Sequence, residues 1–289
     1  MKILILGKNG MLGHVVYNYF KEMGHEVLGT VLEGDSIIYD AFKNQESLED
    51  IIKENNPDVV INCIGILNQV AEDNKLLAVK LNSELPHYID SLSSKYNFKF
   101  IHVSTDCVYE GTVGKYDETV LPDATSFYGR SKALGEVNND RNVTLRTSIV
   151  GPDNNPNGIG LFQWFMKQQG ETGGYTKVVW TGVTTIELTK AMEKAINNNL
   201  TGLHHVVNND FIPKYDLLVL FKDIFNKNIV VNENPNVVSE KTLVRTEKSF
   251  DFNVPTYEQM VEEMKDWVLN HQDLYPEIFE QCELRRILK

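Results

Sequence analysis

Cysteine is scarce in this chain, with three cysteines in 289 residues at positions far apart: Cys63, Cys107 and Cys282. Their odd number and the lack of a Cys-x-x-Cys pair exclude a disulfide framework and a cysteine-based zinc site. We therefore expect no bound metal. Because disulfides persist mainly in oxidising compartments, we also expect the protein to reside in a reducing cytoplasm.

Basic side chains are also fewer than acidic ones: the chain has 28 Lys and Arg residues and 40 Asp and Glu residues, so its formal net charge is −12. Nucleic-acid backbones are bound by clustered Lys and Arg, so a nucleic-acid partner is not expected. No apolar run approaches the length of a membrane span. The first apolar run begins directly after Met1 and leaves no room for a signal peptide, so we expect no membrane association.

A glycine-rich segment joins the first apolar run to a helical pattern. The run Lys2–Leu6 predicts a buried parallel strand, and the apolar positions from Val15 to Phe20 have helical spacing. Glycines in such a turn permit a tight bend and close approach of a pyrophosphate, and the helix N-terminus favours the anion. We predict a dinucleotide site, the alternative being a glycine-rich turn without a ligand. Its residues are Gly7, Asn9, Gly10, Met11, Leu12 and Gly13.

The second predicted strand, Glu26–Val31, bears on which dinucleotide is bound. An acidic residue at its end would bond the ribose 2′-hydroxyl of NAD and repel an extra phosphate. Thr30 and Val31 occupy that region and Glu33 comes late, so the pattern favours NADPH, with NADH as the alternative. Asp40 is a candidate contact for the adenine end of the cofactor. An ordinary loop aspartate is the alternative.

Two separate segments carry the parts of a proton-delivery site. Ser104 and Thr105 follow the apolar run 98–103, where a strand would present hydroxyls at its carboxyl end. Tyr128 precedes Lys132 by one helical turn, so the two lie on the same helix face. Tyrosine has a pKa of about 10. Because a nearby ammonium stabilises the phenolate, we expect Lys132 to lower the pKa of Tyr128 into the working range.

Strand and helix patterns alternate through the first half of the chain, which is typical of a parallel sheet with helices on both faces. We predict an α/β fold with a doubly wound Rossmann sheet, in which residues 1–150 form an NAD(P)-binding domain. Cys63, Ile64 and Gly65 would line the cofactor path, and Asn82 would bond a loop backbone. The expected helices are 48–55, 73–96 and 127–137, and the expected strands are 58–63, 98–103 and 143–146.

The pattern changes after residue 150, where a turn-rich stretch, 151–158, begins. We predict a smaller C-terminal substrate-binding lobe over residues 151–289, some segments of which return to the Rossmann domain. The tail 277–288 alternates charged and apolar residues, which fits a solvated terminal helix or a contact with a partner subunit. The expected elements are helices at 161–169, 185–197, 214–225 and 256–270, a loop at 173–182, and a strand at 203–207.

Aromatic and basic side chains of the lobe are candidates for nucleotide recognition. Tyr175, Trp180 and Trp164 would stack on uracil or thymine. Lys177 would pair with a phosphate. The alternative for each of them is an ordinary packing or surface role.

The chain resembles the extended short-chain dehydrogenases/reductases, and in particular the dTDP-4-dehydrorhamnose reductase family. The resemblance is clear over roughly residues 1–150 and weaker beyond. It implies reduction of a nucleotide-linked 4-keto-6-deoxyhexose by NAD(P)H. The segments that carry it are Gly7-Lys8-Asn9-Gly10-Met11-Leu12-Gly13, Ser104-Thr105-Asp106-Cys107-Val108-Tyr109, Tyr128-Gly129-Arg130-Ser131-Lys132 with Gly135-Glu136, and Leu145-Arg146-Thr147-Ser148.

The resemblance also implies roles for individual residues. Thr105 would polarise the ketone, and Tyr128 would protonate the new alkoxide. Lys132 would tune Tyr128 and hold the nicotinamide ribose, so Tyr128 and Lys132 belong to the cofactor site as well. Ser104 would contribute to the cofactor site, and Asp106, with Thr105, to the substrate site.

One residue departs from the family pattern. The family usually has tyrosine where this chain has Cys107, and related dehydratases carry Asp-Glu directly after the threonine, so the dehydratase base is missing here. GDP-fucose synthases resemble this chain in having a cysteine two positions after the catalytic hydroxyl, where it serves as an acid/base in epimerisation. A tuned thiol can act in this way. Cys107 would then add C3 epimerisation to reduction, the alternative being a small cysteine that fills space.

Further segments resemble a subgroup of the family associated with acetamido sugars. This resemblance implies a reductase that makes UDP-N-acetyl-L-rhamnosamine or a related sugar from a UDP-2-acetamido-2,6-dideoxy-4-hexulose. We expect this compound as the substrate, with dTDP-4-dehydrorhamnose as the alternative. A function of another class stays open, because the beta subunit of methionine adenosyltransferase belongs to the same family and is a regulatory, NADP-binding protein. A homodimer is one alternative for the oligomeric state. The segments are Asp106-Cys107-Val108-Tyr109, Leu121-Pro122-Asp123-Ala124, Gly174-Tyr175 and Trp180-Thr181-Gly182.

Overall fold

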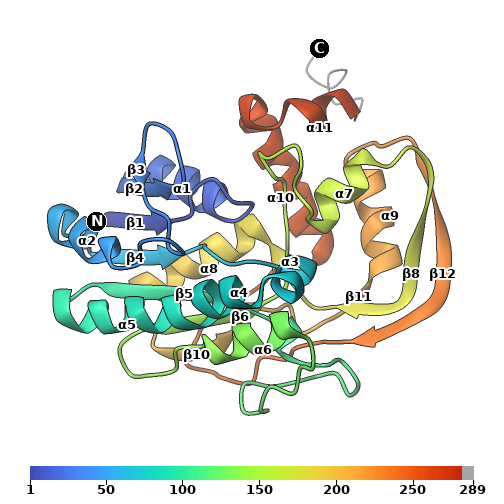
Figure 1. Ribbon diagram of the computed structural model, residues 1–289. Helices are drawn as coiled ribbons and strands as arrows, with labels where there is room; N and C mark the ends of the chain where they lie inside the picture. The colour runs from blue at the N-terminus through green and yellow to red at the C-terminus, as the bar shows by residue number, and fades with distance from the viewer. Residues whose placement is uncertain (282–289) are drawn as a thin grey trace.

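The computed structural model describes residues 1–281, and its centre is a seven-stranded, fully parallel sheet (Figure 1). The strand order is β10-β6-β5-β4-β1-β2-β3, so the direction of winding changes between β1 and β4. Ligands of such sheets bind at the carboxyl ends of the strands beside this switch point. The predicted Rossmann fold is confirmed. The strands are β1 (Lys2–Leu6), β2 (Glu26–Val31), β3 (Ile37–Ile38), β4 (Val59–Asn62), β5 (Lys99–Thr105), β6 (Val143–Thr147) and β10 (Gly202–His205).

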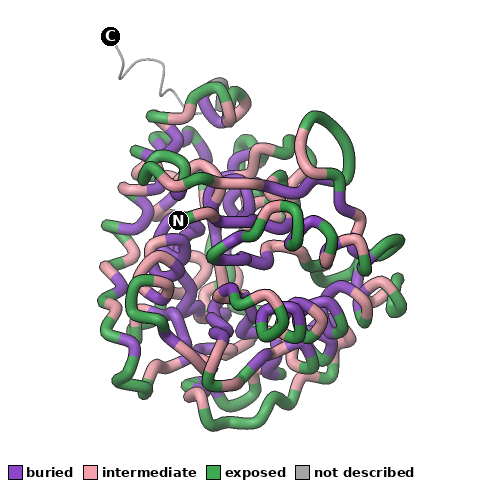
Figure 2. Tube along the Cα trace, turned by 90° about the vertical axis from the view of Figure 1, so that its left-hand side faces the viewer, coloured by how far each residue is buried: buried purple, intermediate pink, exposed green. Residues whose placement is uncertain are grey.

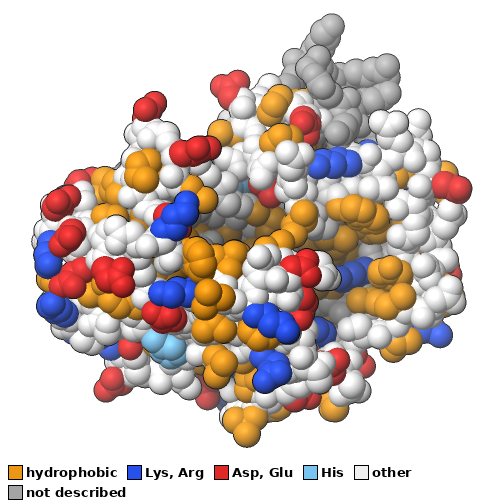
Figure 3. All heavy atoms as spheres, in the orientation of Figure 1, with side chains coloured by type: hydrophobic (Ala, Val, Ile, Leu, Met, Phe, Trp, Pro, Cys, Tyr) orange, Lys and Arg blue, Asp and Glu red, His pale blue; other side chains and the backbone are white. Residues whose placement is uncertain are grey.

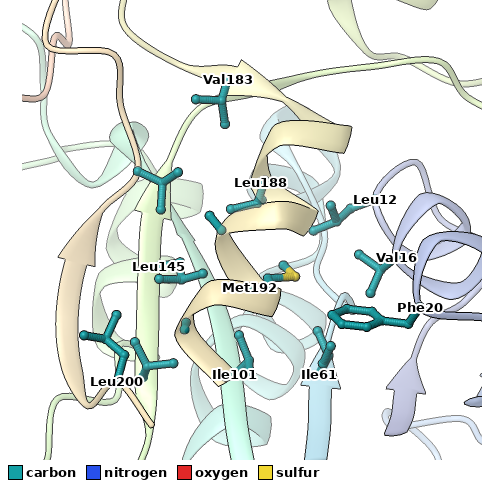
Figure 4. Packing of buried hydrophobic residues seen from close by; sticks show 14 of the residues in the cluster. Leu12, Val16, Phe20, Ile61, Ile101, Leu145, Val183, Leu188, Met192 and Leu200 are labelled. Carbon is teal, nitrogen blue, oxygen red and sulfur yellow. The ribbon is translucent and has the colours of Figure 1, made fainter. Parts of the chain in front are cut away.

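Helices cover both faces of this sheet because successive residues of each buried strand point to opposite sides. Ile3 and Ile5 of β1 pack with α1 (Gly13–Glu22) and α8 (Thr185–Asn197), whereas Leu4 and Leu6 pack with α2 (Ser47–Asn55) and α5 (Leu85–Tyr96). Figure 4 shows the first of these layers, and Figure 2 shows the buried interior enclosed by exposed loops. The side chains that meet in the layer of Figure 4 include Val16, Phe20, Ile61, Ile101, Leu145, Leu188 and Met192.

The long helix predicted for 73–96 is interrupted. It consists of α4 (Lys75–Ala78), a π-helical turn (Val79–Glu84) and α5, and is preceded by α3 (Asn68–Asp73). The π-helical turn carries Asn82, whose side chain accepts from the Ile66 N–H at 3.0 Å and donates to the Ile66 carbonyl at 3.0 Å. The predicted role of Asn82 in bonding a loop backbone is therefore confirmed.

A second sheet forms the smaller lobe, which we define as the three strands β11-β8-β12 with α7 and α9. The expected loop at 173–182 is wrong, because residues up to Trp180 belong to β8. A Cβ on Gly174 would lie 2.8 Å from the Cα of Tyr215, so the glycine is needed where α9 packs on the strand. The elements are α7 (Leu161–Lys167), β8 (Gly170–Trp180), β11 (Ile212–Pro213), α9 (Lys214–Ile224) and β12 (Ile229–Glu240).

Segments from the second half of the chain also complete the first sheet. β10 pairs with β6, and a short parallel pair joins β7 (Ile149–Val150) to β9 (Val183–Thr184). The chain then ends with α10 (Tyr257–Asn270), a 3₁₀ turn (Gln272–Leu274) and α11 (Pro276–Gln281). Beyond the last described residue lie Cys282 and most of the tail 277–288. The domain boundary near residue 150 stays a prediction.

Two absences hold for residues 1–281. No helix there is both long and apolar enough to cross a membrane. In the same part of the chain, no three His, Cys, Asp or Glu side chains gather in a group that would hold a metal ion.

Candidate active site

The glycine-rich turn lies at the carboxyl end of β1, beside the switch point. Gly7 has a φ of +79°, and its N–H donates to Thr30 Oγ1 at 3.0 Å. A Cβ on Gly13 would lie 2.1 Å from the Gly7 carbonyl oxygen, so this glycine is required by the packing of α1 on the turn. At Gly10 the same Cβ would meet only the Gly7 oxygen, at an ordinary 3.5 Å. Protein packing therefore does not require glycine at position 10, and a pyrophosphate at the N-terminus of α1 fits here.

The segment after β4 packs against this turn. A Cβ on Gly7 would lie 3.0 Å from Ile64 Cγ1 and 3.5 Å from the Cys63 carbonyl carbon. Burial raises the pKa of the Cys63 thiol to about 12, so Cys63 is a neutral thiol. Asn82 Oδ1 lies 3.3 Å from the position of a Cβ on Gly65. The structure thus brings Cys63, Ile64 and Gly65 beside the glycine-rich turn, and their contact with a cofactor stays a prediction.

At the outer end of the turn, Lys8 crosses over β2. A Cβ on Gly29 would lie 2.4 Å from Lys8 Cδ, so the lysine stem occupies the space above this glycine. Lys8 Nζ donates to Ser36 Oγ at 2.5 Å. Asp40 accepts the N–H groups of Phe42 and Lys43, each at 3.1 Å, which is the loop role that was its alternative. The sequence analysis missed Lys8, although it lies within the glycine motif.

Thr105 and Tyr128 meet at the carboxyl end of β5. Thr105 Oγ1 donates to Asp106 Oδ1 at 3.1 Å and accepts the Cys107 N–H at 3.1 Å. The Tyr128 phenol lies near the same hydroxyl, which lowers the pKa of Tyr128. The two predicted catalytic hydroxyls therefore lie close together at this end of the strand.

Helix α6 (Phe127–Leu134) can approach this strand end because of its glycine. A Cβ on Gly129 would lie 2.1 Å from the Cys107 carbonyl oxygen. Ser126 caps the helix, and its Oγ accepts the Gly129 N–H at 3.1 Å. The residue after Tyr128 therefore fixes the distance between the tyrosine and the strand.

The expected electrostatic tuning of Tyr128 by Lys132 is not seen. Burial raises the pKa of Tyr128 above its ordinary value, the charges of Cys107 and Asp106 raise this pKa further, and the nearby Thr105 hydroxyl lowers it. Lys132 Nζ instead donates to the Val103 carbonyl at 2.7 Å. Burial also lowers the pKa of Lys132, to about 8. The phenol is consequently a protonated hydroxyl near neutral pH.

A buried ion pair that the sequence analysis did not identify supports this strand end. Arg146 holds Glu136 through two bonds, Nε to Oε1 at 2.8 Å and Nη2 to Oε2 at 2.6 Å. Ser104 Oγ donates to Glu136 Oε1 at 2.5 Å, so this hydroxyl is engaged in the network, and its contact with a cofactor stays a prediction. Arg146 Nη1 also donates to the Tyr109 hydroxyl at 2.7 Å and lies 3.0 Å from His205 Nε2.

Cys107 and Asp106 lie beside the paired hydroxyls. Burial, followed by the Asp106 charge, raises the pKa of the Cys107 thiol to about 12. Burial also raises the pKa of Asp106, while the positive charges of Lys214 and Lys241 lower it. A Cβ on Gly111 would lie 2.6 Å from Lys241 Cγ, so the Lys241 stem lies over the loop that follows Cys107. These two lysines of the second half were not predicted.

The predicted substrate residues of β8 do not share one face. Tyr175 is 40% exposed and Lys177 is exposed, whereas Trp180 is only 5% exposed and packs in the core against Tyr257. Because strand side chains alternate, Trp180 points away from the other two. Its burial does not favour stacking on a base, while Tyr175, Lys177 and the partly exposed Trp164 keep that prediction open. Figure 3 shows a hollow between the Rossmann sheet and the lobe, bordered by hydrophobic side chains.

Several proteins of known name are similar in sequence to a large part of this chain. A probable low-salt glycan biosynthesis reductase of Haloferax volcanii is 30% identical over 178 residues, which is 57% of this chain and 59% of that protein, so the match spans less than two thirds of its length. The methionine adenosyltransferase 2 subunit beta of Xenopus laevis is 24% identical, covering 78% of this chain and 72% of that protein. A dTDP-4-dehydrorhamnose reductase of Aggregatibacter actinomycetemcomitans is 26% identical, covering 77% and 78%.

Solved structures agree on the fold. The dTDP-4-dehydrorhamnose reductase of Bacillus anthracis, determined in complex with NADP, has a TM-score of 0.79 at 19% identity and covers 92% of this chain and 99% of that chain. The family of the RmlD substrate binding domain matches residues 1–249, and the glycine-rich turn and the Thr105–Tyr128 pair lie within that match. The chain therefore belongs to the RmlD substrate binding domain family.

Proposed function

We propose that the protein is an NADPH-dependent reductase of a nucleotide-activated 4-keto-6-deoxyhexose, and that its substrate is a UDP-2-acetamido-2,6-dideoxy-4-hexulose. The observation that carries this proposal is that Thr105 and Tyr128 lie close together at the carboxyl end of β5. The pair lies at the same edge of the sheet as the glycine-rich turn, where cofactor and substrate would meet. A protein that only bound a dinucleotide would have no use for this paired donor.

The side chains fit a proton-coupled reduction of a ketone. When bound, the nicotinamide supplies the hydride. When substrate binds, the Thr105 hydroxyl would turn its proton from Asp106 to the ketone oxygen and polarise the carbonyl, and the protonated Tyr128 would deliver its proton as the oxygen becomes an alkoxide. Lys132, a residue of the same helix, carries a positive charge below a pKa of about 8, and its Nζ, which bonds the Val103 carbonyl at 2.7 Å, would hold the nicotinamide ribose. Lys214 and Lys241, whose charges reach Asp106, would neutralise part of the substrate diphosphate.

NADPH is proposed over NADH because of Lys8. Its ammonium bonds Ser36, in the loop that follows β2, where the adenosine ribose would lie, and no acidic side chain ends that strand. An ammonium and a hydroxyl together suit a 2′-phosphate.

Replacing Lys8 by alanine is expected to weaken NADPH on the order of tenfold or more while NADH is little affected, because only NADPH offers the phosphate. The measurement is the Kd of each cofactor by fluorescence titration. Lys21→Ala is the matched control, since Lys21 lies in the last turn of α1 and its Nζ is 6.0 Å from the centroid of the Tyr17 ring, over which Lys8 Nζ lies at 5.0 Å. Equal losses for both cofactors in the Lys8 variant would contradict this assignment.

Cys107 is proposed as the acid in a C3 epimerisation that accompanies reduction. The neighbouring Asp106 carboxylate would take the C3 proton to leave an enolate, and the Cys107 thiol, which is protonated because its pKa is raised to about 12, would give its proton to C3. We expect Cys107→Ser to lose solvent deuterium uptake at C3 while it still reduces a substrate that already has the product configuration at C3. Cys63→Ser is the control, because Cys63 is a second cysteine with a pKa of about 12. Unchanged deuterium uptake in the Cys107 variant would assign this cysteine to packing.

The proposed function is tested by following NADPH oxidation with two freshly generated 4-ketosugars in deuterated water. One is UDP-linked with an N-acetyl group, and the other is dTDP-linked without it. Turnover of the UDP substrate supports the proposal. Turnover of the dTDP substrate alone would instead identify a dTDP-4-dehydrorhamnose reductase.

A regulatory role is the second candidate, favoured by the similarity to methionine adenosyltransferase 2 subunit beta over 78% of this chain. A regulatory subunit would bind NADPH without turnover. The complete set of Thr105, Tyr128 and Lys132 supports catalysis instead. The same assay separates the two, because NADPH binding without oxidation in the presence of either sugar would favour the regulatory role.

A further inference from the structure

The C-terminal segment beyond residue 249 reaches back to the glycine-rich turn. The RmlD family match ends at residue 249, and α10, the 3₁₀ turn and α11 follow it. Tyr275 lies between the 3₁₀ turn and α11, is 2% exposed and packs in the hydrophobic core of the lobe. His14 is also buried, and it is the second residue of α1, directly after Gly13.

Three hydrogen bonds connect this segment to the turn, and their directions are fixed. Trp267 Nε1 can only donate, and it bonds the Tyr275 hydroxyl oxygen at 2.9 Å. Tyr275 lies 2.7 Å from His14 Nε2, and His14 Nδ1 lies 3.0 Å from the Gly10 carbonyl oxygen. A carbonyl only accepts, so Nδ1 carries the imidazole proton and Nε2 accepts from the Tyr275 O–H. Burial lowers the pKa of His14, which agrees with a neutral ring.

The last bond determines how one peptide group is oriented. The Gly10 carbonyl also accepts the backbone N–H of His14 at 3.0 Å, so one residue holds this oxygen through two donors. The peptide group is planar and trans, so the Met11 N–H points opposite to the Gly10 carbonyl. The carbonyl points into α1, and the Met11 N–H therefore points out of the helix N-terminus, where a pyrophosphate would be bound.

We propose that Tyr275 is a positioning residue for the cofactor. Through His14 it holds the Gly10–Met11 peptide in the orientation that presents the Met11 N–H to the pyrophosphate of the dinucleotide. This inference rests on the proposed function, because it requires that the glycine-rich turn bind the cofactor. The C-terminal segment beyond residue 249, which lies outside the family match, thereby takes part in cofactor binding through Tyr275, a residue 261 positions after His14 in the chain.

The test is Tyr275→Phe, which removes the hydroxyl and keeps the ring. We expect the Kd for NADPH to rise about three- to tenfold, because His14 Nε2 loses its donor and the imidazole is no longer held in place. The KM for the ketosugar and kcat at saturating NADPH should not change. Tyr257→Phe is the matched control, because the Tyr257 hydroxyl donates to the carbonyls of Trp180 and Asp210 and has no contact with the turn.

The outcomes separate this inference from the proposed function. A wild-type protein that binds no dinucleotide would overturn both. If the wild type binds NADPH and Tyr275→Phe has the same Kd, or if Tyr257→Phe weakens NADPH equally, the positioning role is overturned and the proposed function stands. Should Tyr275→Phe fail to fold, Trp267→Phe removes the first donor of the chain, and its NADPH Kd is expected to rise in the same direction. An unchanged Kd in that variant would also overturn the positioning role.

Discussion

Tyr128→Phe is expected to lower kcat by about 10²- to 10⁴-fold, which is the usual contribution of a positioned general acid. The substitution removes one oxygen and leaves the ring, which is 8% exposed and packed on the Rossmann side of the site. Thr105 would still polarise the ketone, but no proton would be delivered to the developing alkoxide. The NADPH Kd should stay close to that of the wild type, since the glycine-rich turn is untouched.

The measurement for this variant pairs steady-state kinetics with cofactor titration. Tyr96→Phe is a suitable control, because the Tyr96 hydroxyl donates to Glu49 at the amino edge of the sheet, away from the site. That variant should retain kcat. Normal turnover by Tyr128→Phe would rule out the assigned proton donor, and a large loss of NADPH binding would show that Tyr128 acts through the cofactor instead.

Arg146→Met is expected to lower the free energy of unfolding by about 3–5 kcal/mol, the usual result of removing one partner of a buried ion pair. The Glu136 carboxylate would remain buried with Ser104 as a donor and without the two guanidinium bonds. The Tyr109 hydroxyl would also lose its contact with the Arg146 Nη1 donor. Because this network supports the end of β5, turnover should fall as well.

Urea unfolding of a double-mutant cycle checks this expectation. Glu136→Gln combined with Arg146→Met should cost less than the sum of the single variants, because the double variant leaves no unpaired charge. Lys53→Met is the control for an exposed pair, since Lys53 bonds Asp50 at the surface, and it should cost less than about 1 kcal/mol. Additive losses at the buried pair, or a loss at Arg146 as small as at Lys53, would show that the ion pair contributes little.

The sequence predicts the first sheet well because each of its early strands is a short apolar run. It fails for β8 and β12 for physical reasons. Gly174 resembles a turn residue, but it is glycine because α9 approaches the strand there. β12 is mostly exposed and rich in polar residues, so neither an apolar run nor alternation indicates a strand. The π-helical turn at Val79–Glu84 likewise has no local sequence signal and is held by Asn82 through the loop at Ile66.

The candidate site, like the fold, has one part that could be predicted from the sequence and another part that could not. Local motifs placed the glycine-rich turn and the Thr105–Tyr128 pair, because the spacing of their residues along one strand or helix determines the geometry. The partners of Lys8 and Arg146 could not be predicted, since each contact joins segments whose approach depends on the whole fold. The opposite orientation of Trp180 relative to Tyr175 would follow from strand alternation once β8 is known to be a strand.

The central claim is that this protein transfers hydride to the C4 carbonyl of a nucleotide-linked ketosugar. The most direct test is single-turnover reaction with NADPH deuterated at the transferring position of the nicotinamide, followed by mass and NMR analysis of the sugar. The account predicts one deuterium at C4 of the product in the wild type, and the same label formed about 10²- to 10⁴-fold more slowly in Tyr128→Phe. A protein that binds NADPH but yields no deuterium at C4 with either ketosugar would contradict the account.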